Sequence, residues 1–468
     1  MGNSNKKDEV LVNGHNVHVP DIREYARRLA NDLPDNDTID NELYIKYDVK
    51  RGLRNANGTG VLVGLTRVGD VVGYELSDND EKLPIPGKLY YRGYDVEDLV
   101  HSCIKEDRFG FEESTYLLLF GELPTQTQLD EFCALLASKR ELPTAFARSL
   151  MLNPSPNVMN RLARNVLALY SYDSKADDIS IENVIRQSIE LIGYFPAMIC
   201  YAYQVKSMYY DNKSLYLHYP SADYGTAQNI LHMIRPTGEF SDLEAKLLDL
   251  SLILHSEHGG GNNSSFTTHL LTSSGTDTYS TIAAALGSLK GPRHGGANIA
   301  VINMMHDLKA NVADITNEKQ VEEYLIKVLK KQANDGSGLI YGLGHAIYTT
   351  SDPRAVTLKA MAKKLAVDKH LEDDFMLCDF IERRGPSLFY EVTGIKKPMP
   401  ANVDLYSGFV YSALNIPNEV ATPLFAMARL SGWCAHRLEE LISGKRLIRP
   451  AYNSVQEPRA YVPMAERH

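Results

Sequence analysis

The sequence predicts a mainly α-helical protein with a small β-hairpin region near its N-terminus. From Asp95 onward, apolar residues recur about every 3.6 residues, and the alternation that is typical of strands is rare. Residues 52–74 differ, because six glycines interrupt short runs of valine and leucine. Asn57-Gly58 and Gly69-Asp70 are turn signals there, and Pro-Ile-Pro-Gly at 84–87 indicates a stiff connector. A hairpin or short meander therefore precedes the helices.

Composition and charge exclude several classes of protein. The chain has 468 residues, 44% apolar and 23% charged, which is typical of a globular protein with a large core. The 49 basic and 59 acidic residues give a net charge of −10, so no overall positive field favours nucleic acid. An anionic substrate would need a local site built from a few arginines.

Cysteines and apolar segments indicate a cytoplasmic protein. The five cysteines are dispersed and form no Cys-x-x-Cys pair, which favours reduced thiols. No apolar segment follows the N-terminus, so we expect no secretory signal. The most apolar window, 191–205, contains Gly193 and Pro196 and is shorter than the ~18 residues of a membrane span. It predicts a buried helix, and no membrane partner is expected.

Three helices of the C-terminal half have clear signals. Ser241 and Glu244 form a capping box at the start of a helix that ends near His255 and His258. A second helix covers 278–290, and a third begins just after His294. Histidines and glycines suit a helix C-terminus, so His258 has a structural explanation as well as a functional one. Metal binding is less favoured there, because the spacing matches no metalloprotease motif and no third ligand is evident.

Other polar residues lie in places where apolar packing does not explain them. The helix N-terminus beside His294 favours a neutral imidazole that can donate to an oxyanion. His345 lies in a glycine loop that no strand precedes, so dinucleotide binding is rejected. Asp404 is an N-cap or a functional carboxylate, and Arg449 belongs to a solvated loop or a site. Arg429 lies among apolar neighbours, where a charge is costly unless it meets an anion.

Taken together, these residues resemble the citrate synthase family. The resemblance covers roughly residues 85 to 455, but the segment before residue 80 matches poorly. Gly259 stands where the family commonly has an acidic residue, although Glu257 keeps a carboxylate before His258. The sequence motifs that carry the resemblance are His-Ser-Glu-His258, Gly-Pro-Arg-His294-Gly-Gly-Ala-Asn, Gly-Leu-Gly-His345-Ala, Asp-Pro-Arg354, Asn-Val-Asp404, the helix around Arg429, Tyr91-Arg-Gly-Tyr-Asp-Val-Glu-Asp-Leu and the run from Tyr116 to Thr125.

The resemblance implies a fold and an assembly. It implies a two-domain fold with a large helical domain, 85–295 plus 401–468, and a small helical domain inserted at 296–400. Residues 1–84 would form an extension with a helix and short strands. It also implies a homodimer in which Arg449 is contributed across the interface. Binding of oxaloacetate would close the cleft between the domains and exclude water.

The resemblance also implies the reaction and the role of each residue. Acetyl-CoA would condense with oxaloacetate and water to give citrate and CoA, without a cofactor or a metal. Asp404 would be the base, His294 the donor to the thioester oxygen and His345 the group that polarises the ketone. The oxaloacetate ligands would be His258, Arg354, Arg429 and Arg449, and the backbone of Leu339, Ile340, Tyr341, Gly342, Leu343 and Gly344 would lie against CoA.

Three alternatives compete with this interpretation. A 2-methylcitrate synthase would use propionyl-CoA with the same residues, since one methylene is worth only ~1–3 kcal/mol of discrimination. A non-catalytic dimeric paralogue is disfavoured, because no catalytic residue is missing. A metal hydrolase built on the histidines is less favoured still.

Overall fold

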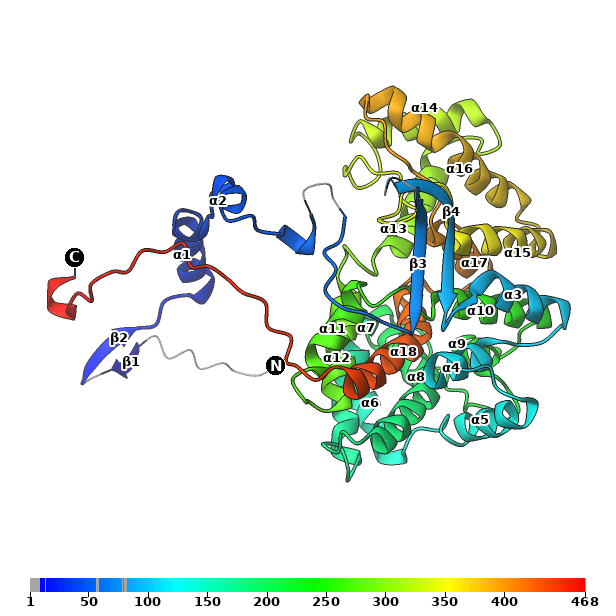
Figure 1. The fold of residues 1–468 in the computed structure, drawn as a ribbon, viewed down its shortest axis with the longest axis horizontal. Coiled ribbons are helices and arrows are strands. Elements are labelled where there is room, and N and C mark those ends of the chain that lie inside the picture. The colour runs from blue at the N-terminus through cyan, green and yellow to red at the C-terminus, as the bar shows by residue number, and fades with distance from the viewer. Residues whose placement is uncertain (1–8, 13, 56–58, 78, 80–81, 468) are drawn as a thin grey trace. The chain divides into compact units, whose positions relative to one another are not determined.

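The computed structural model describes residues 9–12, 14–55, 59–77, 79 and 82–467 (Figure 1). Asn57-Gly58, one of the two predicted turns, lies outside them. The chain divides into two compact units, one of residues 1–63 with 449–468 and one of residues 64–448. This division does not test a small domain at 296–400, which stays a prediction.

The first unit is small, and the residues that the structure describes in it form no buried core. Strands β1 (Glu9–Val12) and β2 (His15–His18) form an antiparallel hairpin, followed by α1 (Ile22–Asp37) and α2 (Asn41–Lys46). Short 3-10 turns cover Arg51–Leu53 and Met464–Glu466. Of the residues described in this unit, none is buried, so its apolar side chains are not stabilised within it. Those most exposed include Leu11, Ile22, Ile45, Leu62, Tyr452 and Tyr461.

The second unit begins with a three-stranded antiparallel sheet. Strand β3 (Gly69–Leu76) pairs with β4 (Lys82–Tyr91), which pairs with β5 (Tyr94–Asp95). The predicted small β region near the N-terminus is therefore confirmed, and an antiparallel bridge joins Arg54 and Gly60 inside 52–74. The turn predicted at Gly69-Asp70 is wrong, because Gly69 starts β3, and residues 84–87 belong to β4 rather than to a connector. Strand β5 pairs only with Tyr90 and Tyr91, so the rest of β4 lies at an edge of the sheet, where proline is tolerated.

Two glycines of this sheet mark a close approach to the loop after His345. A Cβ on Gly73 would lie 2.6 Å from the Ile347 carbonyl oxygen. One on Gly87 would lie 2.3 Å from the Ser351 carbonyl oxygen, which accepts the Gly87 N–H at 3.1 Å. These glycines therefore let β3 and β4 pack directly against the loop that positions His345.

Helices form the rest of the second unit, so the predicted fold class is confirmed. The long helix α18 is its centre, packing against α4, α8, α10, α11, α12 and α13. Every residue from Val420 to Leu438 except Phe425 is buried. The helices are α3 (Val96–Lys105), α4 (Phe111–Phe120), α5 (Gln126–Ser138), α6 (Thr144–Leu152), α7 (Val158–Leu169), α8 (Ile181–Asp211), α9 (Thr226–Ile234), α10 (Asp242–His255), α11 (Asn263–Thr272), α12 (Thr278–Lys290), α13 (Ala297–Asn311), α14 (Glu318–Leu329), α15 (Pro353–Lys369), α16 (Glu372–Thr393), α17 (Val403–Ala413) and α18 (Asn418–Ser443).

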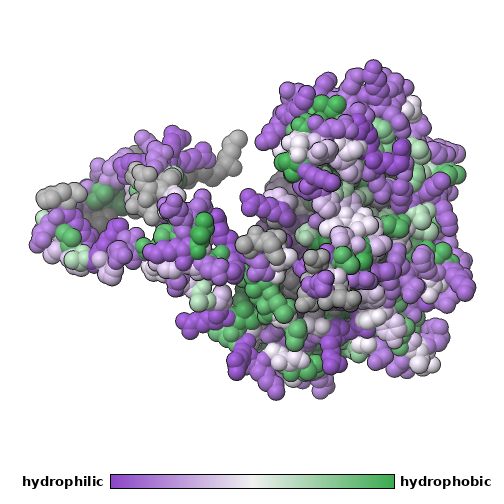
Figure 2. All heavy atoms as spheres, turned by 45° about the horizontal axis from the view of Figure 1, so that its top comes forward, coloured by the Kyte–Doolittle hydropathy of each residue, from purple (hydrophilic) through white to green (hydrophobic). Residues whose placement is uncertain are grey.

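The local predictions for these helices agree with the structure. Ser241 Oγ accepts the Glu244 N–H at 3.2 Å, and Glu244 Oε2 accepts the Ser241 N–H at 2.8 Å, so the capping box is confirmed. Helix α12 has the predicted bounds. Residues 191–205 lie inside α8 and are almost all buried. Within the described part of the chain, no helix combines the length and apolarity needed to cross a bilayer, and the face in Figure 2 is mainly hydrophilic.

Candidate active site

His258 and His345 come together in the structure. His258 follows the C-terminal end of α10 and is buried, whereas His345 lies in the loop before α15. Their rings meet edge to face with centroids 5.1 Å apart. Tyr348, which the sequence did not single out, stacks on His345 at 4.5 Å. The α10 turn and the glycine loop thus form one site.

Hydrogen bonds fix the tautomer of His345. Its Nδ1 accepts the backbone N–H groups of Ile347 at 3.1 Å and Tyr348 at 3.0 Å. A nitrogen that accepts carries no proton, so the neutral ring has its proton on Nε2. Burial and then the charge of Arg354 lower the pKa of His345 to about 4. His345 is therefore a neutral Nε2–H donor at physiological pH.

Arg354 lies in the first turn of α15 and is held by Asp352. Its Nε and Nη2 lie 3.0 and 2.8 Å from the two carboxylate oxygens of Asp352. Asp352 also caps α15 and accepts the Val403 N–H at 3.2 Å. The Asp352 carboxylate therefore ties the start of α15 to the start of α17.

Asp404 is the second residue of α17. Asn402 caps this helix, and its side-chain oxygen accepts the Asp404 N–H at 3.0 Å. The protein around the carboxyl group excludes water and raises its pKa to about 6, against the opposing charge of Arg354 and with the help of Asp352. Asp404 is therefore a stronger base than an exposed aspartate, yet it is mostly ionised at neutral pH.

Arg429 is fully buried in the middle of α18. Its Nε donates to the His255 carbonyl oxygen at 2.8 Å, and the guanidinium lies 4.8 Å from the Phe425 ring centroid. Among the described residues, nothing accepts from its Nη1 or Nη2, and His258 Nε2 also lacks a partner. Because a buried charge normally has partners, this arrangement is suited to binding a carboxylate.

His294 lies in the turn before α13. Its Nε2 is 2.9 Å from Ser264 Oγ, which also accepts the Trp433 indole N–H at 3.1 Å. Burial and then the charge of Arg429 lower the pKa of His294 to about 4. The ring is neutral as predicted, but burial rather than the helix N-terminus is the main cause.

The glycine loop at 339–344 is attached to the start of α17. Gly344 N–H donates to the Pro400 carbonyl at 2.7 Å, and Asn402 N–H donates to the Gly342 carbonyl at 2.9 Å. Gly342 has φ +86°, and a Cβ there would lie 2.9 Å from Leu405 Cβ. Ile340 is buried and Leu339 is exposed. The loop therefore has a fixed conformation, and its contact with CoA stays a prediction.

Arg449 is the one predicted residue outside the second unit. It begins the C-terminal segment of the first unit, and its side chain is exposed. The other six polar residues of the predicted site, His258, His294, His345, Arg354, Asp404 and Arg429, all belong to the second unit.

Glu257 is a buried residue of the site whose structural role the sequence did not reveal. Its Oε1 accepts from His436 Nε2 at 3.0 Å and from the Gly259 N–H at 2.5 Å. A Cβ on Gly69 would lie 2.7 Å from Glu257 Cγ, and one on Gly432 would lie 2.4 Å from its Oε2. Glu257 thus fixes the turn that carries His258, which explains how a glycine is accommodated at 259. No local motif could have indicated the pair with His436.

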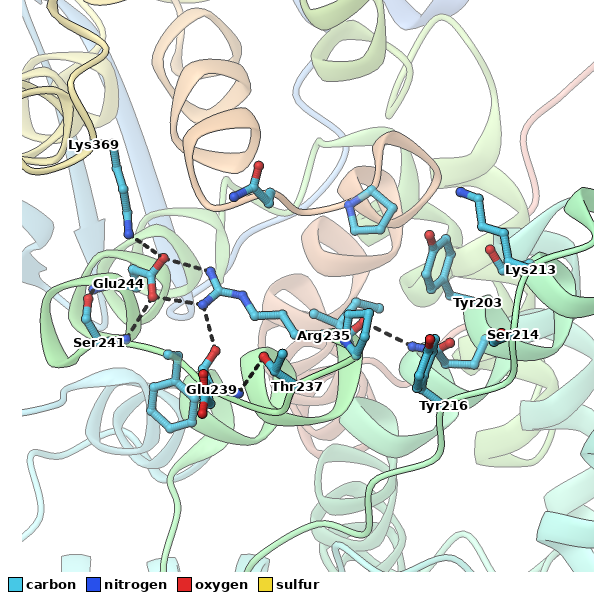
Figure 3. A pocket seen from close by; sticks show the side chains of 17 residues that line it. Tyr203, Lys213, Ser214, Tyr216, Arg235, Thr237, Glu239, Ser241, Glu244 and Lys369 are labelled. Carbon is cyan, nitrogen blue, oxygen red and sulfur yellow. Dashed lines mark hydrogen bonds and ion pairs between the residues drawn. The ribbon is translucent and has the colours of Figure 1, made fainter.

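A separate pocket lies away from these residues. It has a volume of about 680 Å³ and lies beside the C-terminal end of α8 and the 234–241 turn (Figure 3). Its Arg235 and Lys369 are bonded to Glu244, at 2.8 and 2.9 Å. None of the predicted catalytic or ligand residues lines it. We therefore do not assign the substrate to this pocket.

A family model described as the citrate synthase C-terminal domain matches residues 57–451. The chain belongs to the citrate synthase family. The resemblance read from its motifs is thus confirmed, and the protein is an enzyme of this family. The mainly helical fold is accordingly a citrate synthase fold.

Curated relatives include two activities. Citrate synthase 2 of Bacillus subtilis is 33% identical over 395 residues, covering 82% of this chain and 94% of the relative. A 2-methylcitrate synthase of Shewanella oneidensis is 32% identical over 380 residues, covering 81% and 92%. Because the two identities are nearly equal, sequence similarity does not separate the two acyl substrates.

A solved structure supports the same fold. It is the ternary complex of citrate synthase from the archaeon Thermoplasma acidophilum with carboxymethyl coenzyme A and oxaloacetate. The TM-score is 0.72 at 26% identity, and the match covers 90% of this chain and 99% of that chain. That relative binds a CoA analogue together with oxaloacetate.

Proposed function

We propose that this enzyme condenses acetyl-CoA with oxaloacetate and water to give citrate and CoA, the entry step of the tricarboxylic acid cycle. The observation that carries the proposal is the buried guanidinium of Arg429, whose Nη1 and Nη2 lack partners among the described residues, as does the Nε2 of His258. Oxaloacetate has two carboxylates, which arginine binds with two parallel hydrogen bonds. Arg354 and Arg429 would supply positive charge on one side of the cleft. The acidic protein thus has a locally basic site.

Three side chains would carry the condensation. Asp404 would take a proton from the methyl group of acetyl-CoA, while the neutral His294 donates to the thioester oxygen. Such a donor is often worth ~3–4 kcal/mol, which a carboxylate base needs because the α-proton is a weak acid. The Nε2–H of His345 would polarise the ketone of oxaloacetate. The methyl carbon then forms a bond to the ketone carbon, and the ketone oxygen becomes the hydroxyl.

Hydrolysis would complete the reaction. Water attacks the thioester carbon, the bond to sulfur breaks, and CoA leaves as the thiol. These steps need neither cofactor nor metal, so we expect turnover to persist in EDTA. Residues 296–400 would form the small domain that closes over the substrates.

The site would be completed by a second copy of the chain. Arg449 belongs to a unit in which no described residue is buried and several large apolar side chains are exposed. Such a unit gains stability by covering these side chains against another surface. A homodimer would cover them and would bring Arg449 to the partner's oxaloacetate.

The test measures CoA release by thiol titration, with oxaloacetate and either acetyl-CoA or propionyl-CoA. We expect a higher kcat/KM for acetyl-CoA and citrate as the product in mass spectrometry. A higher value for propionyl-CoA would identify a 2-methylcitrate synthase, which the Shewanella oneidensis relative makes the second candidate. Absence of turnover with both thioesters would favour a non-catalytic dimer.

A further inference from the structure

Two histidines and three glutamates form a cluster behind the substrate site. One face of α18 carries His436 together with Glu439 and Glu440, which lie three and four residues after it. The neighbouring helix α11 carries His269. Glu257 connects this cluster to the turn that carries His258. The condensation described above uses none of these five side chains to touch substrate.

One ligand atom each from His269, His436 and Glu439 lies close enough to the others to bind a single metal ion. His269 Nε2 lies 3.1 Å from His436 Nδ1, and His436 Nδ1 lies 3.9 Å from Glu439 Oε2. All three atoms lie within 4.8 Å of one another. Tetrahedral zinc with bonds of about 2.0–2.1 Å needs neighbouring ligand atoms roughly 3.3 Å apart. Metal binding would therefore draw Glu439 Oε2 closer to both histidine nitrogens, by no more than about 1.5 Å.

Glu439 has one oxygen available for such a bond. Its Oε1 accepts the Arg67 N–H at 2.6 Å, which anchors the carboxylate. Its Oε2 is closed off from solvent and has no hydrogen-bond partner among the residues that the structure describes. A buried carboxylate oxygen without a donor is costly, and a cation beside it would remove that cost.

Carboxylates orient both rings toward the same point. His269 Nδ1 is 2.8 Å from Glu440 Oε2, and His436 Nε2 is 3.0 Å from Glu257 Oε1. Ligating histidines in metal sites characteristically donate their other N–H to a carboxylate or carbonyl. Each ring is therefore held with its remaining nitrogen toward the other ring and Glu439.

The charge of the cluster favours a divalent cation. Three carboxylates surround two imidazoles, and the nearby Arg92 and Arg429 donate their hydrogen bonds to Leu118 and His255 rather than to the cluster. The three carboxylates carry a charge of about −3. One extra proton shared by the two rings would reduce this to about −2, whereas Zn²⁺ would reduce it to about −1. The cluster is nearly closed, with His269, Glu439 and Glu440 each between 12% and 14% exposed, which leaves a path for entry.

We propose that His269, His436 and Glu439 bind one zinc-type divalent cation. Glu440 and Glu257 orient the two histidines, and water completes the coordination. The site is separate from the condensation chemistry and acts as a structural clasp between α11 and α18. The sequence motifs did not indicate it, because His269 and His436 lie 167 residues apart.

The test uses the full-length chain, freed of any affinity tag, stripped with a chelator and dialysed. Titration with Zn²⁺ should bind about one ion per chain, and Co²⁺ should give the visible absorption of a low-coordinate nitrogen and oxygen site. The variants His269→Gln and Glu439→Gln should lose both signals. His232→Gln is the matched control, because His232 is half-buried and bonded to a backbone carbonyl outside the cluster.

A further variant separates ligand from orienting residue. Glu440→Gln should keep the stoichiometry but weaken Zn²⁺ binding by ~10- to 100-fold, as loss of such a partner does elsewhere. If His269→Gln does not fold by circular dichroism, Glu439→Gln carries the test, because the amide keeps the shape of the carboxylate. Failure of the stripped wild type to bind Zn²⁺ or Co²⁺, or wild-type binding by the ligand variants, would overturn the proposal and leave a proton shared between the rings.

Discussion

Asp352 and Arg354 form a bidentate ion pair that is almost closed off from solvent, with the carboxylate 1% and the arginine 4% exposed. The same carboxylate accepts backbone N–H groups at the start of α15 and of α17. One buried side chain therefore positions both the arginine proposed for oxaloacetate and the helix turn that carries Asp404.

Asp352→Asn should destabilise the fold as well as the site. Removing one partner of a buried pair leaves an uncompensated charge, so we expect the free energy of unfolding to fall by about 3–5 kcal/mol. Urea unfolding followed by circular dichroism measures the change. Asp107→Asn, which removes the exposed partner of Lys246, is the control and should leave the unfolding midpoint unchanged. Equal midpoints for both variants would show that the pair does not organise this region.

Asp404→Asn should separate binding from chemistry. The amide has nearly the shape of the carboxylate but cannot accept a proton, so folding and oxaloacetate binding should persist. Loss of a general base should lower the condensation rate by at least ~100-fold. Steady-state kinetics and calorimetric titration with oxaloacetate measure the two effects. A variant that retains most of its turnover would remove Asp404 from the role of base.

The pH profile should report the raised pKa of Asp404. The base acts only when ionised, so log(kcat/KM) should fall as the pH drops through about 6, with a slope approaching one. The pKa values of His294 and His345 are lowered to about 4, so both rings stay neutral near pH 6. Their protonation therefore does not contribute to the fall in kcat/KM there. Circular dichroism at each pH checks that the protein remains folded. A profile that is flat down to pH 5 would contradict this assignment.

Local signals in the sequence predicted helices well and long-range contacts poorly. The capping box of Ser241 and Glu244 and the bounds of α12 depend on neighbouring residues, so the sequence was sufficient. Gly69-Asp70 was wrongly predicted as a turn, because a turn and a close approach to another segment use the same residue type, and a Cβ on Gly69 would lie 2.7 Å from Glu257 Cγ. The Glu257–His436 pair joins residues 179 apart, and only the fold brings them together.

Arg449→Ala should affect one substrate selectively. A lost charge-assisted hydrogen bond costs about 1.5–3 kcal/mol, which corresponds to a rise of roughly 10- to 150-fold in the KM for oxaloacetate. The KM for acetyl-CoA should change far less. Arg446→Ala is the control, because Arg446 is also exposed and lies three residues before Arg449. This variant should leave both KM values near those of the wild type. A rise in the acetyl-CoA term alone would contradict the role of Arg449 as an oxaloacetate ligand.

Two inactive variants should restore activity in mixed dimers. Asp404→Asn and Arg449→Ala are each expected to be nearly inactive as homodimers under limiting oxaloacetate. If each site takes Asp404 from one chain and Arg449 from its partner, a hybrid carries both lesions in one site and none in the other. Unfolding and refolding the two chains together permits exchange, since an obligate dimer does not exchange readily. Random reassortment makes about half of the dimers hybrid, so about a quarter of wild-type activity should return.

A second pair of variants tests whether this recovery depends on the origin of Arg449. Asp404 and His294 both belong to the second unit, and we expect both to serve the same site of one chain. A hybrid of Asp404→Asn with His294→Ala then has one lesion in each site, so its activity should stay at the parental level. Differently sized tags allow hybrid formation to be verified on native gels. If hybrids of Asp404→Asn with Arg449→Ala form but remain inactive, Arg449 serves its own chain, and recovery in both pairs would show that subunit exchange alone repairs the enzyme.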